Sequence, residues 1–268
     1  ARCVFVADMD SDGDMDIAYA LLLADRQWGS EGDIDYRERA REIVDRLAQW
    51  ALGPEQRFIK LGDWVGSHSG SLETTMRPSD FMPDHFRAFE MLTGDPRWGI
   101  ARTQIYEAIL ELQSDGVGLV TDFVTATEGT LSAVGGDLLE GPADGTYALN
   151  ASRVPWRIGV DYLVSGDDRA RDFLQTLTHW ARDTSGSQPQ DFLGKYWPDG
   201  DSYSDDTRGA LFYTGPLGVG AMASDDQIWL DALWDYTRGH SGTVYYQDTL
   251  RVLSMVAMSG NWWSPARL

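Results

Sequence analysis

The 268-residue sequence contains a single cysteine, Cys3, and only four histidines, which are scattered along the chain. One cysteine cannot form a disulfide within the chain and cannot supply a cysteine-rich metal site. The histidines lack the paired spacing that zinc hydrolases use on a helix. We therefore expect no metal and no other cofactor.

Long apolar runs and basic residues are also scarce. No apolar run approaches the 18 residues of a membrane-spanning helix, so no membrane association is expected. The chain has 22 basic against 42 acidic residues, and its net charge of −20 argues against a nucleic-acid partner because phosphates would be repelled. The same charge favours solubility and would attract a cationic substrate. Residue 1 is alanine rather than methionine, so export cannot be judged from this end.

Aromatic residues are abundant, with 11 Trp, 11 Tyr and 9 Phe. Most of them are expected in the core, but carbohydrate clefts also use exposed aromatic faces as stacking surfaces. The aromatic content therefore favours a carbohydrate ligand. The length allows a large core in one domain or two, and we expect one helical domain over residues 1–268.

Apolar residues recur with the 3.6-residue period of a helix through most of the chain. In the segment that begins at Asp14, one face carries Ile17, Leu21, Ala24 and Trp28. We predict about nine helices in sequential pairs, a pattern that favours a helical bundle or toroid. The other helical segments are residues 34–52, 83–94, 97–113, 152–166, 168–186, 208–223, 225–239 and 245–263.

Other segments depart from this pattern. Residues 56–64 and 118–124 are predicted to be strand-like, and the glycine-rich stretch from Thr125 to Tyr147 is predicted to be a long loop. Long loops in compact domains are often functional. Gly215 and Pro216 predict an interruption of the helix over residues 208–223, because proline cannot donate a backbone hydrogen bond.

The stretch "DMDSDGDMDIAY" places Asp8, Asp10 and Asp12 before a glycine, as in the first half of a calcium-binding loop. The twelfth position is Tyr19, which cannot provide the two carboxylate oxygens of such a loop. No helix is predicted before it, so calcium binding is disfavoured. Acidic residues at this place also suit the positive end of the following helix.

The segment "SDGDMDIAYALLLADRQW" resembles the signature of glycoside hydrolase family 8. The resemblance continues in family order through "RFIKLGDW", "RPSDFMPDHFRAF", "NASRVPWRIGVDYLVSGD" and "SGNWW". It implies an all-α (α/α)6 barrel around a cleft for a β-1,4-linked polysaccharide, which members hydrolyse with inversion. Endoglucanases, lichenases, chitosanases and xylanases share this framework. We accordingly expect a secreted, monomeric enzyme whose partner is its polysaccharide substrate.

The resemblance also implies site residues. It assigns Asp12 to the cleft floor, where the family uses an aspartate to hold and distort the sugar. The position of the usual general base is Asn150, whose amide cannot accept the proton. A chitosanase- and lichenase-like group also has asparagine there and draws its base from the preceding loop, where the matching residue is Glu140. The alternatives on the same loop are Asp122, Asp137 and Asp144.

The general acid of the family lies in a Ser-Glu-Gly-type segment well before the Asp12 segment. The eleven residues before Asp12 contain no glutamate. Glu31 stands in such a triplet but follows Trp28, where the family has an ordinary turn, so it is not assigned as the acid. We expect a barrel that is incomplete on its N-terminal side, with the acid outside this chain if the enzyme is active. The alternative is a non-catalytic carbohydrate-binding relative.

Several other residues are candidates for substrate binding. Asn150 and Arg153 can hydrogen-bond a sugar or orient water, although Arg153 could equally form an ion pair. Asp80 stands where cellulase-type members tend to have tyrosine. Glu140 with Asn150 favours chitosan or mixed-linkage β-glucan over xylan, and the net charge mildly favours chitosan. The candidate stacking surfaces are Trp64, Trp156, Tyr196 and Trp197, of which Trp156 is expected in the core.

Overall fold

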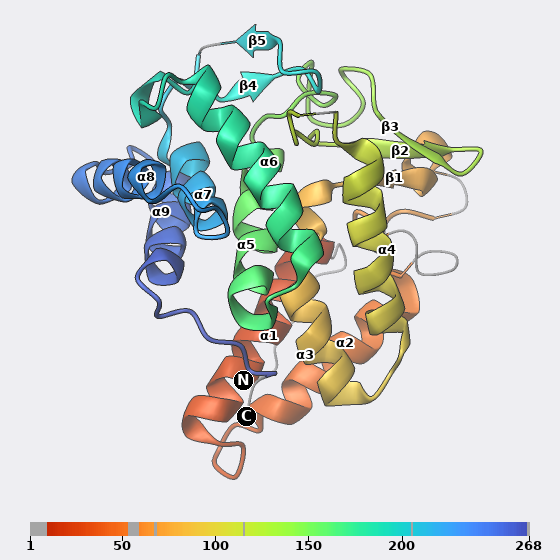
Figure 1. Cartoon of the computed structure of the whole chain (residues 1–268). Coiled ribbons are helices and arrows are strands. Elements are labelled where there is room, and N and C mark those ends of the chain that lie inside the picture. The colour runs from red at the N-terminus through yellow and green to blue at the C-terminus, as the bar shows by residue number, and fades with distance from the viewer. Residues whose placement is uncertain (1–9, 53–58, 67–68, 115, 205, 267–268) are drawn as a thin grey trace. The chain divides into compact units, whose positions relative to one another are not determined.

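The computed structural model describes residues 10–52, 59–66, 69–114, 116–204 and 206–266 (Figure 1). The chain divides into two compact units, which are considered separately below. Unit 1 contains residues 1–76, 85–105 and 264–268, and unit 2 contains residues 77–84 and 106–263. The prediction of one domain over residues 1–268 stays a prediction.

Helices dominate the described part of the chain, where nine α-helices occur in the order shown in Figure 1. They are α1 (Ser11–Trp28), α2 (Tyr36–Trp50), α3 (Pro83–Thr93), α4 (Arg97–Leu112), α5 (Val154–Ser165), α6 (Asp168–Thr184), α7 (Leu211–Ala221), α8 (Gln227–Gly239) and α9 (Tyr245–Met258). The 3-10 helices are η2 (Gly70–Thr74), η3 (Pro78–Asp80), η4 (Ala151–Arg153) and η5 (Pro189–Asp191). The strands are β1 (Thr75–Met76), β2 (Val124–Thr127), β3 (Thr130–Ala133), β4 (Lys195–Tyr196) and β5 (Ser202–Ser204).

Each predicted helical segment overlaps one of these helices, so the helix predictions are confirmed. The predicted apolar face of α1 is wrong, because Ile17 and Trp28 are 53% and 73% exposed and the buried face carries Met15, Ala18, Tyr19 and Leu22 instead. Glycine residues in the left-handed conformation follow two of the helices. Gly94 follows α3 with φ 71°, and Gly166 ends α5 with φ 70°, the left-handed conformation that glycine adopts without steric cost.

The predicted interruption at Gly215 and Pro216 is wrong, because α7 runs unbroken with the proline inside it. A proline within a helix costs about 3 kcal/mol through its missing N–H and its steric clash. All eleven residues of α7 are buried, and the helix packs against α5, α6, α8 and α9 within unit 2. Burial of apolar surface on every side stabilises the helix enough to offset that local cost.

The β-strand predictions are partly wrong. Residues 56–58 lie outside the described part, and the remainder of that segment forms isolated bridges, Leu52 with Ile59 and Asp10 with Gly62. The segment 118–124 is irregular until β2 begins at Val124. The predicted long loop contains an antiparallel hairpin of β2 and β3, so only its second half is irregular. The alternation of apolar and polar residues in these segments is too short to distinguish a strand from an irregular segment.

Unit 1 is built on the pairing of α1 and α2. Its core includes an aromatic group in which Trp98 lies against Phe86 and Phe89, with ring centroids 5.2 and 5.1 Å apart. Nearby on α3, the buried His85 ring stacks on Tyr19 of α1 at 4.0 Å. His85 Nε2 also lies 3.0 Å from Asp16 Oδ1. These contacts fix the first turns of α1, which carry Asp12.

Unit 2 is organised around α7, beside which α5, α6, α8 and α9 lie (Figure 1). The approach of α5 requires Gly159, since a Cβ there would lie 3.2 Å from the backbone carbonyl carbon of Val219. A buried aromatic group at one end of α7 includes Tyr147, Phe192 and Tyr213. This group supports the segment that leads into Asn150.

Candidate functional site

Unit 2 brings Glu140, Asn150 and Arg153 together through a chain of hydrogen bonds. Asn150 Nδ2 donates to Glu140 Oε2 at 2.9 Å. Arg153 Nη2 donates to Asn150 Oδ1 at 3.0 Å and to Ser79 Oγ at 2.7 Å. Asn150 is buried and Glu140 is exposed to solvent. The carboxylate is thus accessible, and the amide holds one of its oxygens in place.

The backbone on either side of Glu140 is held by Asp144. Asp144 is buried, and its Oδ2 accepts hydrogen bonds from the backbone N–H groups of Leu139 and Glu140 at 2.7 and 3.1 Å. Its Oδ1 accepts from Gly141 N–H at 3.0 Å. An aspartate that collects neighbouring N–H groups in this way fixes a tight turn. The turn carries the Glu140 side chain.

Asp122 holds the backbone on either side of Asn150. It is buried, and its Oδ1 accepts from the backbone N–H groups of Ala148 and Ala151 at 3.1 and 2.7 Å. These two residues flank Asn150, the position that precedes η4. Burial raises the pKa of the Asp122 carboxyl to about 7, although the backbone N–H groups around Asn150 oppose the shift.

The three alternative bases on the loop differ from Glu140 in their surroundings. Asp122 and Asp144 are buried and accept backbone N–H groups, so access of a substrate water to them is restricted. Asp137 is exposed, and its φ of 59° places it in a left-handed turn. Among the four carboxylates, Glu140 combines exposure with the hydrogen bond to Asn150.

Asp12 lies in the first turn of α1 in unit 1 and is partly exposed. Its Oδ1 accepts from the backbone N–H of Gly13 at 2.9 Å. Asp10 occupies the N-cap position without a side-chain capping hydrogen bond, and its Oδ1 accepts instead from Trp64 Nε1 at 3.3 Å. Asp10 therefore positions the Trp64 ring rather than capping the N-terminus of α1.

The acidic residues at the start of α1 affect one another. The pKa of Asp14 is raised to about 6, chiefly because of burial and then because of the charges of Asp63, Asp10 and Asp12. Within the described residues, no group of three or more His, Cys, Asp or Glu side chains is arranged to hold a metal ion. Asp8, which the calcium alternative would use, lies outside the described residues.

Two of the predicted stacking residues present their rings to solvent. Trp64 in unit 1 is 38% exposed, and Trp197 in unit 2 is 44% exposed. Trp197 lies edge-on to Tyr203 at 5.1 Å, across the β4–β5 hairpin. Backbone hydrogen bonds of 2.9 and 3.1 Å between Tyr147 and Tyr196 connect this hairpin to the segment that enters Asn150.

Two binding predictions are corrected by burial. Tyr196 is only 2% exposed; its hydroxyl accepts from Leu193 N–H, and its ring packs against Trp180. Asp80 is fully buried, with Arg77 Nε 3.9 Å from its Oδ2. Neither side chain is accessible to a sugar, because successive strand residues alternate in direction and η3 faces the interior. Trp156, expected in the core, is 4% exposed.

Sequence reasoning did not identify Ser79 or the anchoring roles of Asp122 and Asp144. Asp144 precedes a glycine in a turn-rich stretch, which is a local signal for an aspartate that caps its own loop. Ser79 and Asp122 lie 74 and 26–29 residues from their partners. No local pattern in the sequence reports contacts of that range.

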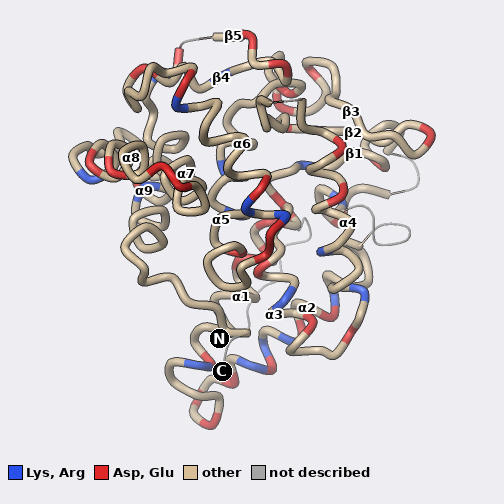
Figure 2. The backbone as a smooth tube through the Cα atoms, in the orientation of Figure 1, with Lys and Arg blue, Asp and Glu red and all other residues tan. Residues whose placement is uncertain are grey.

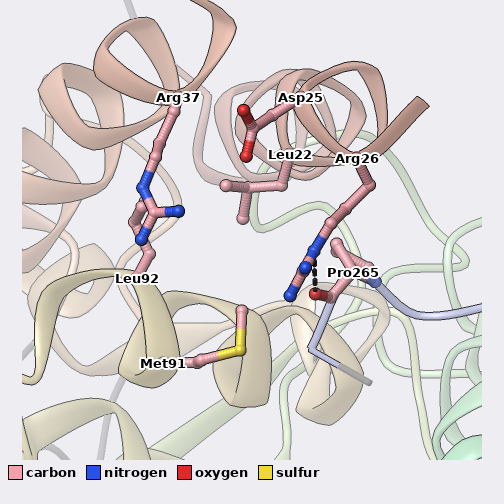
Figure 3. A pocket seen from close by; sticks show the side chains of 7 residues that line it. All are labelled: Leu22, Asp25, Arg26, Arg37, Met91, Leu92 and Pro265. Atoms are coloured by element: carbon pink, nitrogen blue, oxygen red, sulfur yellow. Dashed lines mark hydrogen bonds between the residues drawn. The ribbon is translucent and has the colours of Figure 1, made fainter. Parts of the chain in front are cut away.

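A separate pocket of about 300 Å³ lies in unit 1 (Figure 3). Figure 3 shows Arg26 and Arg37 on opposite sides of it, with Met91 below. It adjoins the last turns of α1, whereas Asp12 lies in the first turn, roughly 20 Å away along a helix that rises 1.5 Å per residue. The pocket therefore contains none of the predicted site residues. It is lined by Leu22, Asp25, Arg26, Arg37, Met91, Leu92 and Pro265.

Acidic residues occur on helices and loops of both units (Figure 2). The acidic residues are therefore spread along the described chain rather than confined to one element. Among the described helices, none is both long and apolar enough to cross a membrane.

Comparison with known proteins gives a consistent assignment. Residues 3–260 match the model for glycosyl hydrolases family 8. A beta-glucanase from Niallia circulans is 40% identical over 262 residues, which are 96% of this chain and 63% of that protein. An endoglucanase from Bacillus sp. (strain KSM-330) is 32% identical, over 96% of this chain and 55% of its own length. The chain thus spans between half and two thirds of these relatives.

Solved structures agree. The apo structure of a beta-1,3-1,4-glucanase from Paenibacillus sp. X4 has a TM-score of 0.92 and 38% identity, over 98% of this chain and 70% of that one. Rex8A from Paenibacillus barcinonensis, complexed with xylose, has a TM-score of 0.78 at 18% identity and therefore supports the fold alone. These matches and the helical structure confirm the predicted all-α, (α/α)6 fold class.

Proposed function

We propose, from the premise that this chain belongs to glycosyl hydrolase family 8, that the protein carrying it is an endo-acting hydrolase of β-1,4-linked glycan. The reaction inverts the anomeric configuration, and the preferred substrate is mixed-linkage β-glucan. The names of the relatives at 40% and 38% identity, beta-glucanase and beta-1,3-1,4-glucanase, support this substrate over xylan. The protein acts as a secreted monomer in this proposal.

The observation that carries the proposal is the hydrogen bond from Asn150 to Glu140. Inverting hydrolysis needs a carboxylate that removes a proton from water on the face of the sugar opposite the leaving group. Asn150 has no basic group for this step. Glu140 is an exposed carboxylate held in one orientation by that amide, which is the arrangement a general base requires.

Arg153 and Asn150 support the base in this mechanism. Arg153 bonds both Ser79 and Asn150, so it fixes which atom of the amide faces Glu140: Oδ1 accepts from the arginine, and Nδ2 is left to donate to the carboxylate. The remaining carboxylate oxygen is then available to the attacking water.

Asp12 has a different role in the proposal. The family resemblance gives Asp12, at the start of α1, the task of holding a bound sugar ring in a distorted conformation, which moves the ring toward the flattened transition state of glycoside hydrolysis. Trp64, which is exposed and whose indole N–H bonds Asp10, provides a stacking surface for the glycan. Trp197 provides another.

The experiment is a reducing-sugar assay of the protein at its natural length on barley β-glucan, soluble chitosan, carboxymethylcellulose and xylan. We expect the highest kcat/KM on β-glucan, and proton NMR of the first product should show the α-anomer. Preference for chitosan would replace the substrate assignment and keep the reaction class. Release of no new reducing ends from any polymer, together with retained binding, would favour a non-catalytic carbohydrate-binding protein.

A further inference from the structure

The turn that carries Glu140 and the turn that carries Asn150 each close on a buried aspartate. Asp144 accepts the backbone N–H groups of residues 139, 140 and 141. Asp122 accepts those of residues 148 and 151. The Glu140–Asn150 hydrogen bond thus spans two turns, and each has its own internal anchor.

The two anchors are also joined to each other by the backbone. Asp122 N–H donates to Thr146 O at 2.8 Å, and Phe123 N–H donates to Asp144 O at 3.0 Å. Thr146 N–H and Asp144 N–H close further turns onto Ala143 and Gly141. The segment before β2 is therefore bonded to the segment between Glu140 and Asn150, and a shift of either aspartate would move both side chains.

We propose that Asp122 and Asp144 are positioning residues that hold Asn150 and Glu140 in the geometry needed for general-base catalysis. This inference rests on the proposed function, because it assigns no chemistry of its own to either aspartate. Both act through Glu140, and neither contacts the sugar.

Asp144 and Asp122 should respond differently to substitution by asparagine. Asp144 uses both carboxylate oxygens, so an amide nitrogen in Asp144→Asn must face a backbone N–H that it cannot accept. Asp122 accepts the N–H groups of Ala148 and Ala151 at the same oxygen, Oδ1, and the N–H of Asn150 also bonds its carboxyl. The oxygen of an amide can still accept the two bonds from Ala148 and Ala151, so Asp122→Asn should keep most of the turn, whereas Asp122→Ala should lose it.

The test measures kcat and KM on β-glucan for Asp144→Asn, Glu140→Gln and the double variant. We expect Asp144→Asn to lower kcat about 10–100-fold with KM changed less than about twofold, since small misplacements of a reacting group carry losses of that order. In the Glu140→Gln background the same substitution should lower kcat less than about twofold, because residues that act as a unit are not additive.

Glu128→Gln is the control. It removes an exposed carboxylate in the β2–β3 turn, so its kcat should equal that of the unmodified protein. Asp122→Asn should retain kcat within about fivefold, while Asp122→Ala should fall as Asp144→Asn does. Equal losses in Asp122→Asn and Asp122→Ala would overturn the role of Asp122 as a hydrogen-bond acceptor.

An equal kcat loss from Asp144→Asn in both backgrounds would overturn the inference. A loss confined to KM, or an equal kcat loss in Glu128→Gln, would also overturn it. If Asp144→Asn does not fold, Asp144→Ser supplies a smaller acceptor and the same comparison. Hydrogen exchange of the N–H groups of residues 139–141, 148 and 151 tests the roles of Asp122 and Asp144 separately from the role of Glu140 as the base. Faster exchange in Asp144→Ser or Asp122→Ala supports the roles of Asp144 and Asp122, even if an active Glu140→Gln variant refutes Glu140 as the base. Unchanged exchange refutes the roles of the two aspartates.

Discussion

The Asn150 side-chain amide donates to Glu140 Oε2 at 2.9 Å, although ten residues separate the two in the chain. This relationship makes a clear prediction about kcat. Glu140→Gln preserves the shape and a hydrogen-bond acceptor but removes the basic carboxylate. We expect kcat on β-glucan to fall by at least about 10²–10⁴-fold, the usual contribution of a general base, with little change in substrate binding.

The control for this variant is Glu128→Gln, which changes an exposed glutamate in the β2–β3 turn and should leave kcat unchanged. Asn150→Ala should lower kcat less than Glu140→Gln, since the carboxylate remains and loses only its orienting partner. A Glu140→Gln protein with most of its activity, beside an inactive variant at Asp122, Asp137 or Asp144, would place the base elsewhere on the loop.

Trp197 is predicted to bind the glycan by ring stacking. Aromatic ring contacts contribute about 0.5–1.5 kcal/mol beyond burial, which corresponds to roughly two- to tenfold in affinity. Trp197→Ala should therefore raise KM for long β-glucan by about that factor with kcat retained. Trp28→Ala, which removes a 73% exposed tryptophan at the end of α1, should leave KM unchanged. Equal KM values for the two variants would remove Trp197 from the binding surface.

The carboxyl of Asp122 links stability to pH. Its pKa is raised by burial from 3.8 to about 7 in the folded protein. The folded state therefore binds this proton more tightly than the unfolded state. The resulting stability is fully present below about pH 4 and is lost as the pH rises through 7, by at most about 1.4 kcal/mol per pH unit.

Asp122→Asn cannot titrate, so its free energy of unfolding should fall less between pH 4 and pH 7 than that of the unmodified protein. Urea unfolding at several pH values across this window measures the difference. Asp14, whose pKa is also raised, is present in both proteins and cancels in the comparison. Parallel pH profiles for the two proteins would contradict the burial effect at Asp122.

The packing of α7 against α9 depends on Gly215. A Cβ at this position would lie 3.0 Å from Ser254 Oγ and 3.2 Å from Ser254 Cβ. Gly215→Ala should lower the free energy of unfolding, because overpacking typically costs about 1–3 kcal/mol and exceeds the roughly 1 kcal/mol gain in helix propensity.

Gly239→Ala is the matched control, since no atom lies within 4 Å of a Cβ placed at this last residue of α8. Its stability should be equal or slightly higher. Both variants can be compared by thermal unfolding followed by far-ultraviolet circular dichroism. A Gly215→Ala protein as stable as Gly239→Ala would show that α9 moves aside without cost.

The sequence by itself determined where the helices lie, because apolar residues recur at a 3.6-residue period through each of these segments. It also determined the order of motifs through which the chain resembles its family. Each of these depends on residues close together in the chain. The resemblance further indicated Glu140 as the loop residue to compare with Asn150.

The tertiary structure decided what depends on contacts between distant residues. It kept Pro216 inside a continuous helix because burial on all sides of α7 outweighs one missing hydrogen bond. It buried Asp80 and Tyr196, which the sequence predicted to bind the substrate. It brought Asp122 to the turn around Asn150 across 26–29 residues. Burial and long-range hydrogen bonding follow from how the helices pack, and no local pattern of residues contains that information.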